Sequence, residues 1–103
     1  MNTIYEFLAA CRERPALYPV TNADDMFIFL QGYIAGSIRG KSKVNAKELE
    51  HFARFGAWLQ KEAKLESNVG WQKTIVLLCA DKRESLDTFF QLLDKYKVEH
   101  PML

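Results

Sequence analysis

Two arginines lie in the segment RERPALYPV, where their guanidinium groups could hold a phosphate. Arg12 and Arg14 have the right chemistry, because guanidinium groups form paired hydrogen bonds with phosphate oxygens. A nucleotide site also requires a glycine-rich loop between a strand and a helix, and the glycines of this chain do not follow that pattern. We therefore interpret the segment as a corner between two helices. Pro15 ends the first helix at Arg14, and Pro19 keeps the connection extended.

The histidines and cysteines do not have the spacing of a metal site. The chain has two histidines, His51 and His100, and no His-x-x-x-His or Cys-x-x-Cys pattern. Cys11 and Cys79 each lie among apolar residues, so we predict two buried free thiols. The adjacent acids of NADD fit the first turn of a helix, where the helix dipole favours negative charge. We predict no metal, no cofactor and no enzymatic activity.

Four helix starts can be read from a repeated pair of residues. A capping residue is followed three positions later by an acid. The capping side chain accepts a hydrogen bond from a backbone N–H, and the acid interacts favourably with the positive end of the helix dipole. The four pairs are Thr3 with Glu6, Thr21 with Asp24, Asn45 with Glu48, and Asp81 with Glu84.

Apolar residues after these starts repeat at helical spacing. The segment from Met26 to Ile38 is apolar on nearly every side, which predicts that the second helix is the most enclosed one. Gly32 and Gly36 on this helix, and Gly56 on the third, indicate close approach of neighbouring helices, because a glycine inside a helix otherwise costs stability. The clearest stripes are Ile4, Phe7, Leu8 and Cys11 near the start, and Leu86, Phe89, Phe90, Leu93 and Tyr96 near the end.

The predicted fold class is all-α, a compact bundle of about five helices around a buried central second helix. Residues 70–80 are apolar without a clear period, so both a helix and a strand fit them. We predict a short helix there, because no other segment alternates in the way that a partner strand would. Residues 1–103 form a single domain, since 103 residues leave no room for a second core. Residues 98–103 are expected to be a frayed tail.

The composition is that of a globular protein without a strong charge bias. Aromatic residues make up 13% and charged residues 26% of the chain. The formal net charge is +1, so the basic surplus typical of direct nucleic-acid binding is missing. The N-terminal segment lacks the features of a signal peptide, and the longest apolar run is too short to span a bilayer. We expect a cytoplasmic protein that binds neither membranes nor nucleic acids directly.

Four segments together resemble a set of small bacterial immunity proteins from polymorphic-toxin and contact-dependent growth inhibition systems. The segments are RPALY, FLQGYIAG, FARFGAWL and GWQKTIVLLCADKRESLDTFFQLLDKY. Most of the shared positions are packing residues, so the resemblance supports a common fold better than a common task. The matching positions are Arg14, Pro15, Tyr18, Gly32, Tyr33, Phe55, Trp58, Leu59, Trp71, Phe89 and Phe90.

The resemblance implies a protein that neutralises a cognate toxin, often a nuclease, by binding to it without catalysis. An acidic surface is the expected contact, because such nucleases have basic clefts. The alternative is a small helical adaptor or regulator, with a homodimer formed through Trp71 and the last helix. Glu50 is a further exposed acid. The residues expected to contact a partner are Arg12, Glu13, Arg14, Asp24, Asp25, Glu48, Glu62, Glu66 and Trp71.

Overall fold

The computed structural model describes residues 3–14, 17–18, 20–39, 46–64 and 70–102, with only the backbone for residues 37–39 and 46. These residues form α-helices and one short 3-10 helix, η2, with no strand among them, so the predicted all-α fold class is confirmed. Residues 70–80 are mainly helical, as predicted. The elements are α1 (Ile4–Glu13), α2 (Ala23–Arg39), α3 (Ala46–Ala53), α4 (Phe55–Glu62), α5 (Trp71–Leu78), η2 (Lys82–Glu84) and α6 (Ser85–Glu99).

The first two helices begin with capping residues close to the predicted ones. The Thr3 hydroxyl accepts a hydrogen bond from the N–H of Glu6 at 3.1 Å, which starts α1 as predicted. Helix α2 begins one residue later than predicted, because the Asn22 side chain accepts from the N–H of Asp25 at 2.9 Å. The Asp25 carboxylate in turn accepts from the hydroxyl and the N–H of Thr21. The two side chains thus satisfy backbone groups reciprocally.

The last helix is entered through a 3-10 turn and is tied to the start of α2. Asp81 caps η2 by accepting from the N–H of Arg83 at 2.9 Å, so it does not cap α6 directly. The hydroxyl of Ser85, the first residue of α6, accepts from the N–H of Ala23 at 2.8 Å and donates to the carbonyl of Lys82 at 2.6 Å. This fully buried hydroxyl joins the N-terminal ends of two helices. The predicted cap at Asn45 lies outside the described residues.

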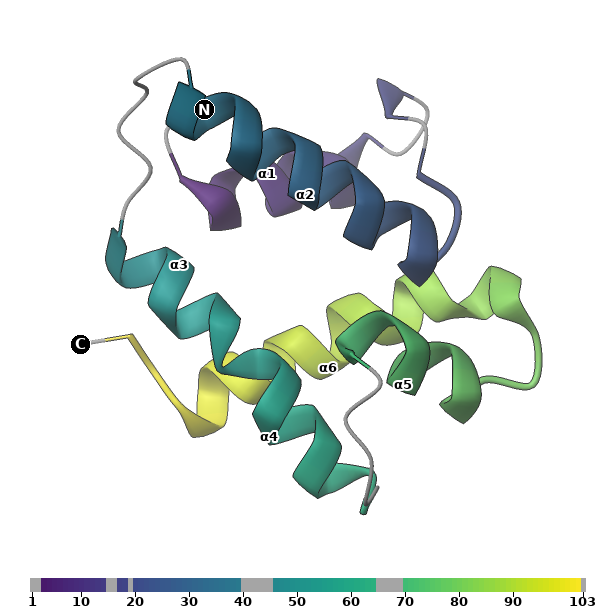
Figure 1. Cartoon of the computed structure of the whole chain (residues 1–103). Helices are drawn as coiled ribbons and strands as arrows, with labels where there is room; N and C mark the ends of the chain where they lie inside the picture. The colour runs from purple at the N-terminus through teal and green to yellow at the C-terminus, as the bar shows by residue number, and fades with distance from the viewer. Residues whose placement is uncertain (1–2, 15–16, 19, 40–45, 65–69, 103) are drawn as a thin grey trace.

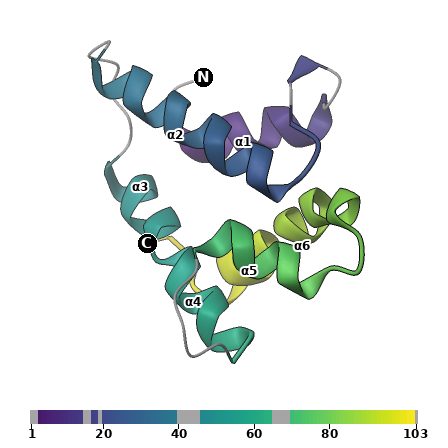
Figure 2. The ribbon, with the colours of Figure 1, turned by 45° about the vertical axis from the view of Figure 1, so that its right-hand side comes forward.

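The helices form two layers (Figure 1). Helices α1 and α2 lie together on one side of the molecule, and α3 to α6 form the other side, as the rotated view also shows (Figure 2). Helix α2 packs on α5 and α6, and α1 packs on α3. The Cα radius of gyration is 13.5 Å, close to the value of about 13 Å expected for a compact domain of 100 residues.

Aromatic rings fill the core between the helices of the larger layer. Phe89 of α6 is fully buried and stacks on Trp71 of α5, with 4.8 Å between the ring centroids. Phe55 of α4 and Phe52 of α3 contact the Phe89 ring edge-on, with 5.9 and 6.5 Å between the ring centroids. The Phe89 ring therefore holds four helices together, and the predicted apolar stripes of α1 and α6 provide most of the other buried hydrophobic residues. The buried part of those stripes is Ile4, Phe7, Leu8, Cys11, Phe90, Leu93 and Tyr96.

Helix α2 is less enclosed than its composition predicts. The buried hydrophobic residues of this helix are Ala23, Met26 and Leu30, which share one side. Ile28, on another side, is 70% exposed. An apolar helix stays exposed wherever no other element covers it, and α2 lies in the smaller layer of the bundle. The second helix is therefore buried along one side and only partly covered elsewhere, which is less enclosure than its sequence predicts.

The glycines of α2 do not mark a close helix contact. At Gly32 and Gly36, no described atom outside the helix's own backbone lies within 4 Å of the position that a Cβ would take, so that prediction is wrong. Gly56 on α4 does face a neighbouring helix. A Cβ there would lie 3.9 Å from two side-chain atoms of Trp71. At Gly56, the small residue fits the approach of α5.

Arg54 divides the predicted third helix into α3 and α4. Its backbone stays near helical values, at φ −79° and ψ −13°, and its N–H donates to the carbonyl of Glu50 at 3.3 Å. Helix α6 continues to Glu99, two residues into the segment that was expected to fray. Within the described part of the chain, no helix has both the length and the apolar character that crossing a membrane requires.

Candidate functional site

His51 connects the first, third and last helices through its imidazole ring. Its Nδ1 lies 2.5 Å from the Tyr5 hydroxyl, and its Nε2 lies 2.5 Å from the carbonyl oxygen of His100. A carbonyl oxygen can only accept, so Nε2 carries a hydrogen and donates it. In the neutral ring Nδ1 is then the acceptor, and the Tyr5 hydroxyl donates to it. We call these three residues the His51 clamp.

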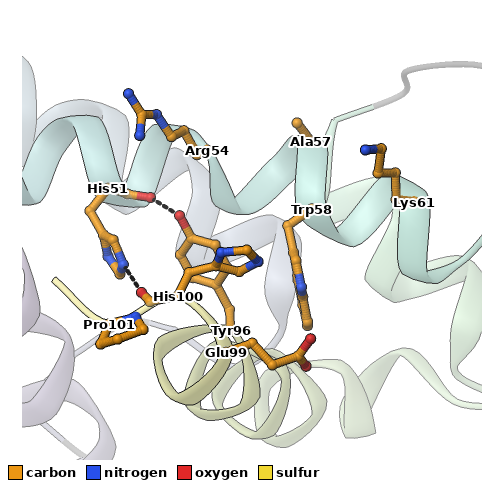
Figure 3. Close-up of a pocket in the computed structure, with 9 residues that line it drawn as sticks. All are labelled: His51, Arg54, Ala57, Trp58, Lys61, Tyr96, Glu99, His100 and Pro101. Atoms are coloured by element: carbon orange, nitrogen blue, oxygen red, sulfur yellow. Dashed lines mark hydrogen bonds between the residues drawn. The ribbon is translucent and has the colours of Figure 1, made fainter.

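Two further contacts hold the clamp in place. The hydroxyl of Tyr96 donates to the backbone carbonyl of His51, and the two rings lie 4.8 Å apart (Figure 3). The carboxylate of Glu48, one turn before His51, accepts from the N–H of Tyr5 at 3.1 Å. The end of α6 is therefore fixed against α3, and α3 against the start of α1.

Burial changes the acidity of the two tyrosines around His51. It raises the pKa of the Tyr5 hydroxyl well above its ordinary value, and the nearby Tyr96 and Glu48 add to the rise. Burial also raises the pKa of Tyr96, whereas the charge of Arg54 acts in the opposite direction. Both hydroxyls are therefore neutral donors at physiological pH.

The Tyr5 hydroxyl makes the stability of the fold depend on pH in the alkaline range. The folded chain keeps this proton at pH values where the unfolded chain, with an ordinary pKa of 10.0, releases it. The contribution of Tyr5 is complete below pH 10 and is lost as the pH rises further. We expect Tyr5→Phe to be less stable than the parent chain at about pH 7, because it lacks the bond to His51. We expect the difference to shrink as the pH rises above about 10, where the unfolded chain begins to release the proton. Urea unfolding followed by circular dichroism measures the difference at each pH, and a constant difference would contradict this assignment.

A groove of about 510 Å³ opens beside the clamp, between α4 and the end of α6 (Figure 3). A smaller hollow of about 330 Å³ adjoins it and shares His51, Arg54 and Pro101. The volume of the larger one lies within the range of about 300–1,000 Å³ typical of ligand pockets. We call it the α4–α6 groove. Its lining residues are His51, Arg54, Ala57, Trp58, Lys61, Tyr96, Glu99, His100 and Pro101.

The α4–α6 groove combines aromatic rings with charges at its rim. The ring of Tyr96 lies 5.5 Å from that of Trp58 and 5.5 Å from that of His100. Arg54 and Lys61 are exposed at the rim, and neither side chain forms an ion pair with a described residue. This arrangement suits a ligand that carries both an apolar group and negative charge.

The residues that the sequence predicted as partner contacts are spread over five helices. Arg12 pairs with Asp94 at 2.8 Å, whereas Glu13 and Arg14 are exposed at the end of α1. Asp24 lies 3.2 Å from Lys82 and 3.5 Å from Lys73. Asp25 is the carboxylate that accepts from Thr21. Arg12, Asp24 and Asp25 therefore already have partners within the chain.

The remaining predicted contacts include one clear correction. Glu48 was expected to be exposed but is buried, because its carboxylate is held against the N–H of Tyr5. Glu62 pairs with Lys95 at 3.1 Å, and Glu50 is exposed. Trp71 is half-buried in the aromatic core. Glu66 lies outside the described residues.

The sequence interpretation missed most of the groove. It considered His51 only as a metal ligand and Trp58 only as a position shared with the immunity proteins, and it assigned no role to Arg54 or Lys61. A signal was present: positions 54, 58 and 61 fall on one helical face, with a cation on each side of a tryptophan. The other wall, at the end of α6, could not be placed from the sequence.

The described residues contain no group of three His, Cys, Asp or Glu side chains that could hold a metal ion. Cys11 is a buried free thiol, and burial raises its pKa. Cys79 is also free but only half-buried.

No protein-family model, curated protein or solved structure matches this chain. The similarity to immunity proteins therefore stays a prediction from the sequence.

Proposed function

We propose that this protein acts by binding another protein, and that it is an immunity protein which neutralises a bacterial toxin without doing chemistry itself. The sequence resemblance suggests the class of partner. The observation that carries the binding role is the α4–α6 groove, where Arg54 and Lys61 flank Trp58 without ion partners among the described residues.

The composition of the groove supports protein binding. Tryptophan, tyrosine and arginine are the residues most enriched among those that dominate binding energy at interfaces. The α4–α6 groove is lined by one residue of each type: Trp58, Tyr96 and Arg54. A stable interface covers about 800 Å² on each partner, so the partner would also cover surface around the groove.

The rigidity of the groove supports the same role. One wall belongs to α4, and the other belongs to the end of α6, which the His51 clamp fixes against α3. A preformed surface loses little conformational entropy when a partner binds. The clamp thus favours tight association by keeping the two walls at a constant separation.

Growth rescue tests the proposed function. The reading frame adjacent to this gene is expressed alone and together with this protein in the same bacterial host. We expect expression alone to stop growth, coexpression to restore it, and the two proteins to copurify. If the adjacent product is toxic and coexpression never restores growth, the immunity proposal is wrong.

One observation favours the alternative of a self-associating adaptor. Leu77 and Leu78, at the end of α5, are 70% and 54% exposed. Adjacent exposed leucines can bury apolar area in a dimer. Light scattering at micromolar concentration distinguishes the two proposals. The adaptor would be favoured if the parent chain is a dimer, the double variant L77E/L78E is a monomer, and coexpression of the parent chain does not restore growth.

A further inference from the structure

We infer that the α4–α6 groove binds an acidic segment of the partner protein, with an apolar side chain seated between two carboxylates. This inference rests on the proposed binding function and names the chemistry of the contact. It also reverses the charge that the sequence resemblance implies, because an acidic patch was expected on this protein.

The two cations of the groove lie on one face of a helix. Arg54 and Lys61 are seven positions apart on α4 and its first flanking residue, which corresponds to about 10.5 Å along a helix. Between them lie Ala57, whose small side chain leaves space, and Trp58. The groove therefore presents positive charge at two ends of one line and apolar surface between them (Figure 3).

The opposite wall of the groove, at the end of α6, carries negative charge. Among the described residues that line the groove, Glu99 is the one acid. Its carboxylate lies 4.0 Å from Lys95, which also pairs with Glu62 at 3.1 Å. Lys95 thus shares its charge between Glu99 and Glu62. Arg54 and Lys61 have no ion partner among the described residues, so the unmatched charge of the groove is positive.

A protein segment suits the groove better than a nucleic acid does. A nucleic acid strand carries a phosphate at every nucleotide, and it would bring phosphates past Glu99 in the lining of the groove. The chain as a whole has a formal net charge of only +1, which gives little general attraction for a polyanion. A peptide can place carboxylates at two points only, with an apolar residue between them.

The aromatic rings of the groove favour an apolar side chain between the two carboxylates of the ligand. The rings of Trp58, Tyr96 and His100 form a continuous aromatic surface, with neighbouring centroids 5.5 Å apart. In an extended segment, alternate residues point to the same side. The order acid, spacer, aromatic, spacer, acid therefore presents all three recognised groups to the groove, and the long side chains of Arg54 and Lys61 can reach the outer two.

A peptide titration followed by two-dimensional NMR tests the inference on the full chain. The probe is the peptide EAFAE, acetylated and amidated, at millimolar concentration. We expect shifts at the indole N–H of Trp58 and at the backbone of residues 54–61 and 99–101. The indole of Trp71, in the core, serves as the internal reference and is expected to stay unchanged. Shifts confined to other surfaces, or no shifts, would overturn the proposal.

Variants and control probes complete the test. We expect R54E and K61E each to weaken peptide binding at least tenfold, and R54Q and K61Q to weaken it less. The matched control K73E reverses an equal charge on α5, outside the lining of the groove, and should leave binding unchanged. The peptides QAFAQ and EAAAE should bind at least tenfold more weakly than EAFAE. Tighter binding of a single-stranded oligothymidine than of EAFAE would overturn the proposal in favour of nucleic acid.

Growth rescue separates this inference from the proposed function. If the parent chain restores growth and R54E/K61E restores it equally well, the groove inference is wrong and the immunity proposal stands. If the parent chain fails to restore growth while EAFAE still shifts Trp58, the immunity proposal is wrong and the groove assignment stands. Thermal unfolding of each variant confirms that it is folded before either result is interpreted.

Discussion

Replacing Phe89 with alanine is expected to destabilise the fold by about 3–5 kcal/mol. The ring is fully buried and contacts Trp71, Phe55 and Phe52, which come from three other helices. Its removal leaves a cavity that these rings cannot fill without moving together. Since a domain of this size has a total stability of about 5–15 kcal/mol, the variant loses a large share of it. Urea unfolding monitored by circular dichroism gives the difference.

The variant Phe89→Leu is the matched control for this loss. It keeps most of the buried volume and is expected to cost less than about half as much as alanine. A cost below about 1 kcal/mol for Phe89→Ala would show that the neighbouring rings collapse into the space, and that Phe89 is not the centre of the core.

Replacing Ser85 with alanine is expected to cost about 1–3 kcal/mol, although only one oxygen atom is removed. The Ser85 hydroxyl accepts from the N–H of Ala23 at 2.8 Å, and both residues are fully buried. Without the hydroxyl, the Ala23 N–H has no acceptor and is shielded from water. The cost is therefore the desolvation of an unpaired backbone group, and thermal or urea unfolding measures it.

Thr3→Ala is the natural comparison. It also removes a hydroxyl that caps a helix, but this cap is exposed, so water can replace it at the N–H of Glu6. We expect a smaller cost, about 0.5–1 kcal/mol. Equal costs for the two variants would contradict the role of burial at Ser85.

Local patterns in the sequence predicted most of the helices. The cap at Thr3 and the buried stripe that begins at Ile4 follow from rules that concern only neighbouring residues. The helix at residues 70–80 was predicted in another way, from the lack of a second segment in the sequence that could pair with it as a strand. The cap of α2 was misplaced by one residue, because Thr21 and Asn22 are both good capping residues and the sequence alone does not choose between them.

The enclosure of α2 could not be predicted, because it depends on how many other helices are available to cover it. An apolar composition states what a helix could bury, and Ile28 shows that the chain does not cover every side. The glycines of α2 were misinterpreted for the same reason. Their presence suggested a close neighbour, but no element of the described structure approaches Gly32 or Gly36.

The candidate site depends even more strongly on tertiary structure. Glu48 matched the pattern of a first-turn acid, yet its carboxylate is held against the N–H of Tyr5, 43 positions away. The groove needs one wall from α4 and one from the end of α6. Sequence spacing indicated the line of Arg54, Trp58 and Lys61, but nothing local indicates that Tyr96 and His100 lie opposite.

The His51 clamp has a consequence for the order in which the molecule folds. Its two ring hydrogen bonds join positions that are 46 and 49 residues apart. Closing a chain loop of this length costs about 3 kcal/mol of entropy, whereas single helices form within about a microsecond. The clamp is therefore expected to close after the helices have formed, so it slows unfolding more than it speeds folding. Because it also sets the walls of the groove, a ligand of the groove would be bound only by chains that have completed folding.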